Sequence, residues 1–322
     1  MSSKKRVVII DQLNLFFRSY IVNPSWATNG FPSGGLKGII ASLQKICREI
    51  KPDEIIFCWD GPGGSVKRKK ILKDYKAGRA PIRLNREVRN LSPEEEQENK
   101  IWQQTRLVEY FNNMPVVQLM YAGTEADDVI SYVKNSPHYE DWEKIIISSD
   151  KDFFQLLDDT TVLYRPIQKQ VLSKLSLIEM FGIHPNNFAL ARAIAGDNSD
   201  NLEGVGGVGL KTIAKRFPFL SEEKSYTIDE LLDFCVESLE TKKIKAYENV
   251  LEKKDIVERN YKMMQLYVPF LSIDSKKDIN NILENADISF NKTKIIKLMN
   301  EDGFGNFDWF ELQTNFKRIV AG

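Results

Sequence analysis

Short clusters of acidic residues recur along this chain, and several come at the end of an apolar run rich in β-branched residues. Asp11 follows Val7–Ile10, Asp60 follows Ile55–Trp59, and Asp150 closes the run that begins at Ile145. Such runs are typical of buried parallel strands, whose carboxyl ends meet at one edge of an open α/β sheet. The pattern therefore predicts that carboxylates far apart in the sequence converge at one edge of a sheet.

The candidate ligands for cations form five clusters: Asp11; Asp60; Glu125 with Asp127 and Asp128; Asp150 with Asp152; and Asp197 with Asp200. Two carboxylates ~4 Å apart repel each other by about 4 kcal/mol at an effective dielectric of ~20, so a converging set needs cations. Oxygen ligands select hard ions, which predicts Mg²⁺ or Mn²⁺ rather than zinc. Two such ions about 4 Å apart can activate water and stabilise the leaving oxygen of a phosphodiester.

The same acids also have ordinary structural explanations. Residues 125–128 open a predicted helix with Thr124 as its cap, and acids in a first turn complement the helix dipole. Asp150 and Asp152 form a pattern that is common in turns. Convergence of several clusters favours metal binding, because unpaired carboxylates are costly to bury.

Composition narrows the class of protein. The chain has 322 residues, 42% of them apolar, so it can bury one large core or two smaller ones. Its three cysteines are far apart and its only histidines are His138 and His184, which argues against a disulfide framework, a zinc site or a Ser/His/Asp triad. The basic start lacks the apolar core of a signal peptide, and no run is long enough to span a membrane. We therefore expect a cytoplasmic protein.

The periodicity of apolar residues predicts an α/β fold. Strands are expected at about 6–11, 54–60, 115–121, 144–149 and 161–166, and helices at 34–50, after Ser92, after Ser176 and over 187–195. Alternating strands and helices predict a central, mostly parallel sheet flanked by helices. We expect an α/β domain at 1–180, interrupted by an excursion at about 61–100, and a helical domain at 181–322.

Two further segments have the chemistry of phosphate binding. Between Val66 and Arg89 there are ten Lys or Arg residues and two acids, which favours contact with a phosphate backbone over a merely solvated basic helix. Glycines at 204, 206, 207 and 209 precede a predicted helix that carries Lys211 and Lys215. Glycines allow close approach of backbone to a ligand, and the spacing does not match a Walker loop.

Taken together, these motifs resemble those of the 5′ nuclease family. That family includes flap endonucleases, the 5′→3′ exonuclease domain of bacterial DNA polymerase I, and phage exonucleases such as phage ribonuclease H. The similarity covers roughly residues 6–217 and rests on three motifs: Glu125-Ala126-Asp127-Asp128, Ser149-Asp150-Lys151-Asp152, and Gly196-Asp197 through Lys211-Thr212. It implies a PIN-like sheet, a helical arch at about 61–100 and a helix-hairpin-helix-type DNA-binding motif at about 190–217.

The resemblance also implies a role for each site residue. Asp11, Asp60, Glu125 and Asp127 match ligands of a first metal ion, and Asp128, Asp150, Asp152, Asp197 and Asp200 match the acids at and around a second. Lys76 and Arg79 would contact the scissile phosphate, Tyr75 would stack on a base, and Arg68 would also contact DNA. Gly204, Gly206, Gly207, Gly209, Lys211 and Lys215 would grip duplex backbone, with K⁺ bound by main-chain carbonyls.

The implied activity is metal-dependent hydrolysis at 5′ ends of DNA or RNA-primed DNA, as 5′→3′ exonuclease or flap endonuclease, in replication or repair. The implied partners are DNA with 5′ flaps, nicks or RNA primers, together with single-strand-binding protein and a sliding clamp. The enzyme would act as a monomer in the cytoplasm of a bacterial or phage-infected cell. The balance of exonuclease to flap activity, and of RNA to DNA ends, stays open.

Two positions depart from the family pattern, and two other functions compete. Gln12 replaces the usual glycine after the first Asp, and Lys67 stands where an aromatic residue is common. A PIN-class ribonuclease usually lacks the glycine hairpin. A catalytically silent junction-binding protein would have lost acids, and none is missing here.

Overall fold

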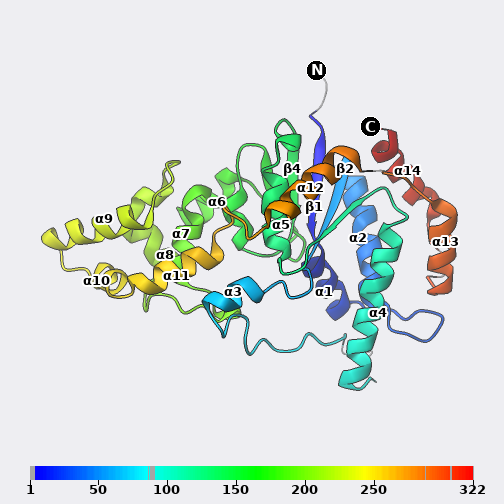
Figure 1. The fold of residues 1–322 in the computed structure, drawn as a ribbon, viewed down its shortest axis with the longest axis horizontal. Coiled ribbons are helices and arrows are strands. Elements are labelled where there is room, and N and C mark those ends of the chain that lie inside the picture. Colours follow the sequence, from blue (N-terminus) through cyan, green and yellow to red (C-terminus); the bar gives the residue numbers. More distant parts are fainter. Residues whose placement is uncertain (1–3, 86, 88–90, 287, 305–306, 322) are drawn as a thin grey trace.

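A six-stranded sheet forms the centre of the computed structural model (Figure 1), which describes residues 4–85, 87, 91–286, 288–304 and 307–321. The strands are β1 (Arg6–Asp11), β2 (Glu54–Trp59), β3 (Val117–Met120), β4 (Glu143–Ile147), β5 (Thr161–Arg165) and β6 (Gln170–Leu172). Their order is β3-β2-β1-β4-β5-β6, and all neighbours are parallel except β5 and β6. The predicted α/β class with a mostly parallel sheet is confirmed. The short antiparallel β6 was not predicted.

The strands are parallel because helices connect them across the two faces of the sheet. Side chains of β1 alternate between two cores: Val7 and Ile9 pack on one face, and Val8 and Ile10 on the other. The first face is covered by α5 (Ala126–Lys134) and then by α7 (Pro185–Ala195). The second is covered by α1 (Gln12–Val22), α2 (Gly34–Ile50) and α4 (Pro93–Phe111). Both faces are therefore buried along β1.

The observed helix ends mostly follow the capping signals. Helix α2 spans the predicted residues 34–50, and Ser92 caps α4 through a reciprocal hydrogen-bond pair with Glu95. The signal at Ser176 was misplaced: α6 (Lys174–Phe181) already begins after Ser173, and Ser176 is its third residue. Thr124 is likewise not the cap of α5, because Glu125 takes the N-cap position.

In the excursion at 61–100, α3 (Val66–Ile71) precedes α4, which begins at Pro93. Among the described residues between these two helices, Tyr75 and Leu84 are buried. Arg86 and Arg89 of the basic block lie outside the described residues. Figure 1 shows α3 beside α11 (Lys254–Met264).

The remaining helices extend away from the sheet and then return to it. They are α8 (Leu210–Arg216), α9 (Ile228–Thr241), α10 (Lys245–Glu252), α12 (Ile273–Asn285), α13 (Lys292–Glu301) and α14 (Trp309–Ala321). Helices α9 and α10 form the far end of the molecule, whereas α13 and α14 lie beside α2 and α4 (Figure 1). Arg106 of α4 pairs with Asp302 after α13 at 2.7 Å, and Arg48 of α2 pairs with Glu311 of α14 at 2.6 Å.

None of the helices in the described part of the chain is both long and apolar enough to cross a membrane. The division at residue 180 stays a prediction, and α13 and α14 belong by packing to the core on the α2 side of the sheet.

Candidate active site

Strand order brings four of the five acidic clusters to the carboxyl edge of the sheet. Asp11 ends β1, Asp60 follows β2, the 125–128 cluster follows β3, and Asp150 follows β4. Asp11 accepts hydrogen bonds from Ser148 Oγ at 2.9 Å and from the N–H of Asn14 at 3.2 Å. Burial, with smaller contributions from Asp60 and Asp150, nevertheless raises the Asp11 pKa to about 7. Because β1, β2, β3 and β4 are parallel, these acids lie at one edge of the sheet, as the sequence predicts.

Asp60 and Asp127 strengthen this acidic edge. Asp60 accepts a hydrogen bond from the backbone N–H of Ala126 at 2.7 Å, and so joins the end of β2 to the start of α5. Its pKa is raised, chiefly by burial. Burial also raises the pKa of Asp127 well above its usual value, and Asp150 adds to the effect.

Glu125 is the most heavily bonded of the acids. Lys76 Nζ donates to one of its oxygens at 2.9 Å, while Arg68 at 3.1 Å and the Tyr75 hydroxyl at 3.2 Å donate to the other. Burial works to raise the pKa of Glu125, but Lys76 and Arg68 outweigh it and hold the pKa below its usual value. Lys76, which the resemblance assigns to the scissile phosphate, and Arg68 and Tyr75, which it assigns to DNA contact, thus share a hydrogen-bond network with a predicted metal ligand.

Asp128 points to a different part of the structure. It is fully buried, and Arg68 donates to its two oxygens at 2.8 and 3.4 Å. The N–H of Phe270 donates to Asp128 Oδ1 at 2.8 Å, and the guanidinium of Arg68 lies over the Phe270 ring. Arg68 is only 3% exposed, so in this arrangement it locks α3 to α5 and to the segment after α11.

Tyr75 is buried as well. Its ring packs in a small cluster with Leu202, Met263 and Met264, and 3% of the residue is exposed. The predicted stacking of Tyr75 on a base stays a prediction.

A second group of acids gathers around two arginines. Arg192 of α7 donates to Asp152 at 3.2 Å and pairs with Asp197, and Arg79 pairs with Asp200. Burial and the neighbouring Asp150 raise the Asp152 pKa to about 7. Burial alone would raise the pKa of Asp197, but hydrogen bonds from Ser199 and the charge of Arg192 lower it. Asp150 has a raised pKa, caused mainly by burial.

Arg192 is a site residue that the sequence reasoning missed. It is 8% exposed and stands alone among the apolar side chains of α7. A single arginine in an otherwise apolar helix, five residues before Asp197, was the available signal, since buried guanidinium groups need acidic partners.

The donor set fits hard divalent cations, because it consists of carboxylate oxygens, several of them buried, that repel one another electrostatically. Within the described ranges, no three Asp, Glu, His or Cys side chains are arranged as a ready metal site. Lys76 forms an ion pair with Glu125 at the sheet edge, and Arg79 and Arg192 form ion pairs with acids of the second group. Gln12, next to Asp11, is fully buried and its amide has no hydrogen-bond partner.

The glycine loop joins α7 to α8 beside the second acidic group. A side chain at Gly204 would lie 2.1 Å from the carbonyl oxygen of Ala195, which explains glycine at this close approach. Gly206, Gly207 and Gly209 are exposed and have open space around them. Lys211 and Lys215 are exposed one turn apart on α8, so backbone and lysines share an accessible surface.

The sequence of this chain is similar to those of known proteins. The family model described as "5′-3′ exonuclease, N-terminal resolvase-like domain" matches residues 6–182. A 5′-3′ exonuclease of Aquifex aeolicus is 28% identical over 91% of this chain and 92% of its own length. The thermostable DNA polymerase I of Thermus aquaticus is 32% identical over 66% of this chain, which spans 24% of that polymerase.

Solved structures show the same fold. A zinc-bound 5′-exonuclease of bacteriophage T5 superposes with a TM-score of 0.64 at 20% identity, covering 93% of this chain and all of the phage protein. A complex of the T5 flap endonuclease with DNA and metal ions gives a TM-score of 0.65 at 18% identity, over 96% of this chain and all of the phage chain.

Proposed function

Because the chain belongs to the 5′-3′ exonuclease family, we propose that it is a divalent-metal-dependent 5′ nuclease that hydrolyses phosphodiesters at the 5′ ends of flapped, nicked or RNA-primed DNA. The observation that carries the proposal is the gathering of acids at four strand ends beside Lys76, Arg79 and Arg192, which pair with Glu125, Asp200 and Asp152. The acids would supply metal ligands, and the neighbouring cations would supply phosphate contacts.

Each group of residues has a distinct task in this proposal. Asp11, Asp60, Glu125 and Asp127 would hold one Mg²⁺ or Mn²⁺, and Asp150, Asp152, Asp197 and Asp200 a second. Bound cations supply activated water and neutralise charge on the leaving oxygen. Asp128 remains a candidate at the edge of this set, although both of its oxygens face Arg68.

Lys76 and Arg79 would bind the scissile phosphate. Both now neutralise carboxylates, Lys76 at Glu125 and Arg79 at Asp200, so arriving metal ions would take over that role and free both side chains for phosphate. Their position supports this exchange: Lys76 is partly exposed, and the Arg79 side chain is 50% exposed.

Gly204–Gly209, with Lys211 and Lys215, would grip the duplex away from the cut. Exposed backbone and two lysines on one surface support phosphate contacts, and we propose K⁺ bound by carbonyls of this loop. We further propose that the protein acts as a monomer in the cytoplasm of a bacterial or phage-infected cell, beside single-strand-binding protein and a clamp.

Cleavage and binding assays on matched substrates test the function. With 5′-labelled flap, nicked and RNA-primed duplexes, we expect short 5′ products in Mg²⁺ and none in EDTA. Asp152→Asn should lower turnover at least 100-fold with less than a threefold change in DNA affinity, because it removes a metal ligand rather than a phosphate contact.

The contrasting variant is Lys211→Ala with Lys215→Ala, which should weaken duplex binding and leave the single-turnover rate at saturating enzyme nearly unchanged. Asp233→Asn, an exposed acid of α9, serves as the control and should match the parent chain. DNA binding without metal-dependent cleavage would instead indicate a silent junction-binding protein, and cleavage of RNA alone would indicate a ribonuclease.

A further inference from the structure

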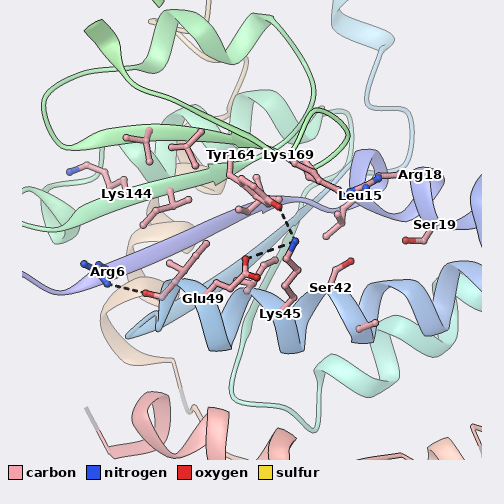
Figure 2. Close-up of a pocket in the computed structure, with 18 of the residues that line it drawn as sticks. Arg6, Leu15, Arg18, Ser19, Ser42, Lys45, Glu49, Lys144, Tyr164 and Lys169 are labelled. Carbon is pink, nitrogen blue, oxygen red and sulfur yellow. Dashed lines mark hydrogen bonds and ion pairs between the residues drawn. The ribbon is translucent and has the colours of Figure 1, made fainter. Parts of the chain in front are cut away.

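A groove lies on the α2 side of the sheet, apart from the acids of the candidate active site. It has a volume of about 870 Å³ and is lined by α1, α2, β4, β5 and β6. Figure 2 shows Arg6 at one end of this groove and Arg18 with Lys169 at the other. It therefore runs along the strands, from their amino ends to the carboxyl edge that carries the acids.

The floor of the groove is aliphatic. Ile145 and Ile147 of β4, Val162 of β5 and Val171 of β6 line it, and Val171 is 59% exposed. Parallel sheets normally have both faces covered by helices. On the opposite wall, α2 presents the small residues Gly38, Ala41 and Ser42 at helical spacing, which leaves room for a further element against the strands.

The acids that line the groove are paired with cations, whereas two of its cations have no acidic partner among the described residues. Each of its three acids has a cation: Glu143 pairs with Arg6 at 2.7 Å, Asp159 with Lys174 at 2.6 Å, and Glu49 with Lys45 at 3.9 Å. Lys144 is bonded to three oxygens at 2.7–3.1 Å. Within the described part of the chain, Arg18 and Lys169 have no acidic partner, and both lie at the carboxyl-edge end.

We propose that this groove docks an acidic amphipathic helix of a partner protein. Its apolar face would cover Val162 and Val171, and carboxylates at one end would meet Arg18 and Lys169, in the helix-in-groove mode of recognition. The five residues of β4 span roughly 13 Å at ~3.3 Å per residue, which corresponds to about nine helical residues at ~1.5 Å rise.

The lining chemistry disfavours a nucleic-acid strand at the same place. Single strands bind to aromatic stacking platforms along a basic track. Tyr164 is the one aromatic side chain that lines the groove, its hydroxyl lies 3.5 Å from Lys45 Nζ, and three carboxylates stand on the rim. An aliphatic floor with two free cations at one end matches a peptide with leucines and glutamates.

The experiment uses the full chain and two labelled 14-residue helical peptides. One carries leucines on one face and glutamates at one end, and the other has lysines in place of the glutamates. Fluorescence anisotropy should show micromolar binding of the acidic peptide alone. The double variant Arg18→Glu with Lys169→Glu should weaken it at least tenfold, and Ser42→Trp should block it by filling the groove.

Lys277→Glu, an exposed lysine of α12, provides the charge control and should not change the affinity. No binding by the parent chain, equal binding of both peptides, or insensitivity to these substitutions overturns the proposal. So does displacement of the peptide by an oligo-dT strand, or a dimer in light scattering that Ser42→Trp dissolves, because a second copy would then cover the groove. Cleavage of flap DNA should be unchanged in all these variants, which separates this test from that of the active site.

Discussion

Arg68 shows how one side chain can have two competing interpretations. Its place in the arch-base motif implies DNA contact, but its guanidinium is buried between Glu125 and Asp128. Removing one partner of a buried ion pair leaves uncompensated charge, at a cost of about 3–5 kcal/mol. We therefore expect Arg68→Met to lower the free energy of unfolding by about that amount in urea denaturation, and added Asp128→Asn to recover part of the loss.

Lys69→Met is the matched control, because Lys69 is exposed on the same helix. It should leave stability within about 0.5 kcal/mol of the parent. If Arg68→Met instead weakened DNA binding at unchanged stability, Arg68 would be a DNA contact and the lock would be unimportant.

Among the secondary-structure elements, α5 is joined to the turn before β5 by the ion pair of Lys134 with Asp158, at 2.7 Å. The amine and the N–H of Thr160 lower the Asp158 pKa to about 2 despite partial burial. A carboxyl whose folded pKa is lowered contributes stability above its unfolded pKa and loses it as pH falls through the folded value. Asp158→Asn should therefore cost roughly 0.5–1 kcal/mol at pH 7 and almost nothing at pH 2.

The measurement is urea denaturation of both chains at pH 7, 4 and 2, with Asp229→Asn as an exposed control in α9. A cost that persists unchanged at pH 2 would show that the hydrogen bond to Thr160, rather than the charge, supplies the stability.

The elements also show what periodicity can and cannot predict. Helix 34–50 and five strands follow from apolar spacing, because burial of one face imposes that spacing. The three-residue β6 has no such pattern. The starts of α5 and α6 were misplaced because two nearby polar residues compete as caps, Thr124 and Glu125 at α5 and Ser173 and Ser176 at α6. At the site, four of the five acidic clusters were predictable as strand ends. The role of Arg192 and the burial of Arg68 and Tyr75 were not predictable, because they depend on contacts between segments far apart in the sequence.

At the scale of the whole molecule, the last helices stabilise the first ones. Phe316 of α14 is fully buried against the α2 side of the core, whereas Phe310 of the same helix is 79% exposed. Phe316→Ala should cost about 3–5 kcal/mol of unfolding free energy and Phe310→Ala less than about 0.5 kcal/mol. Thermal and urea denaturation measure both, and similar small losses would mean that α14 is not part of the core.

This return of α13 and α14 has a consequence for biosynthesis. The apolar surface of α2 forms early in translation, but α13 and α14, which cover it, are translated much later. A ribosome-bound chain must therefore hold that surface open while about 250 further residues are made. The core on the α2 side of the sheet is therefore complete only once α13 and α14 have left the ribosomal tunnel.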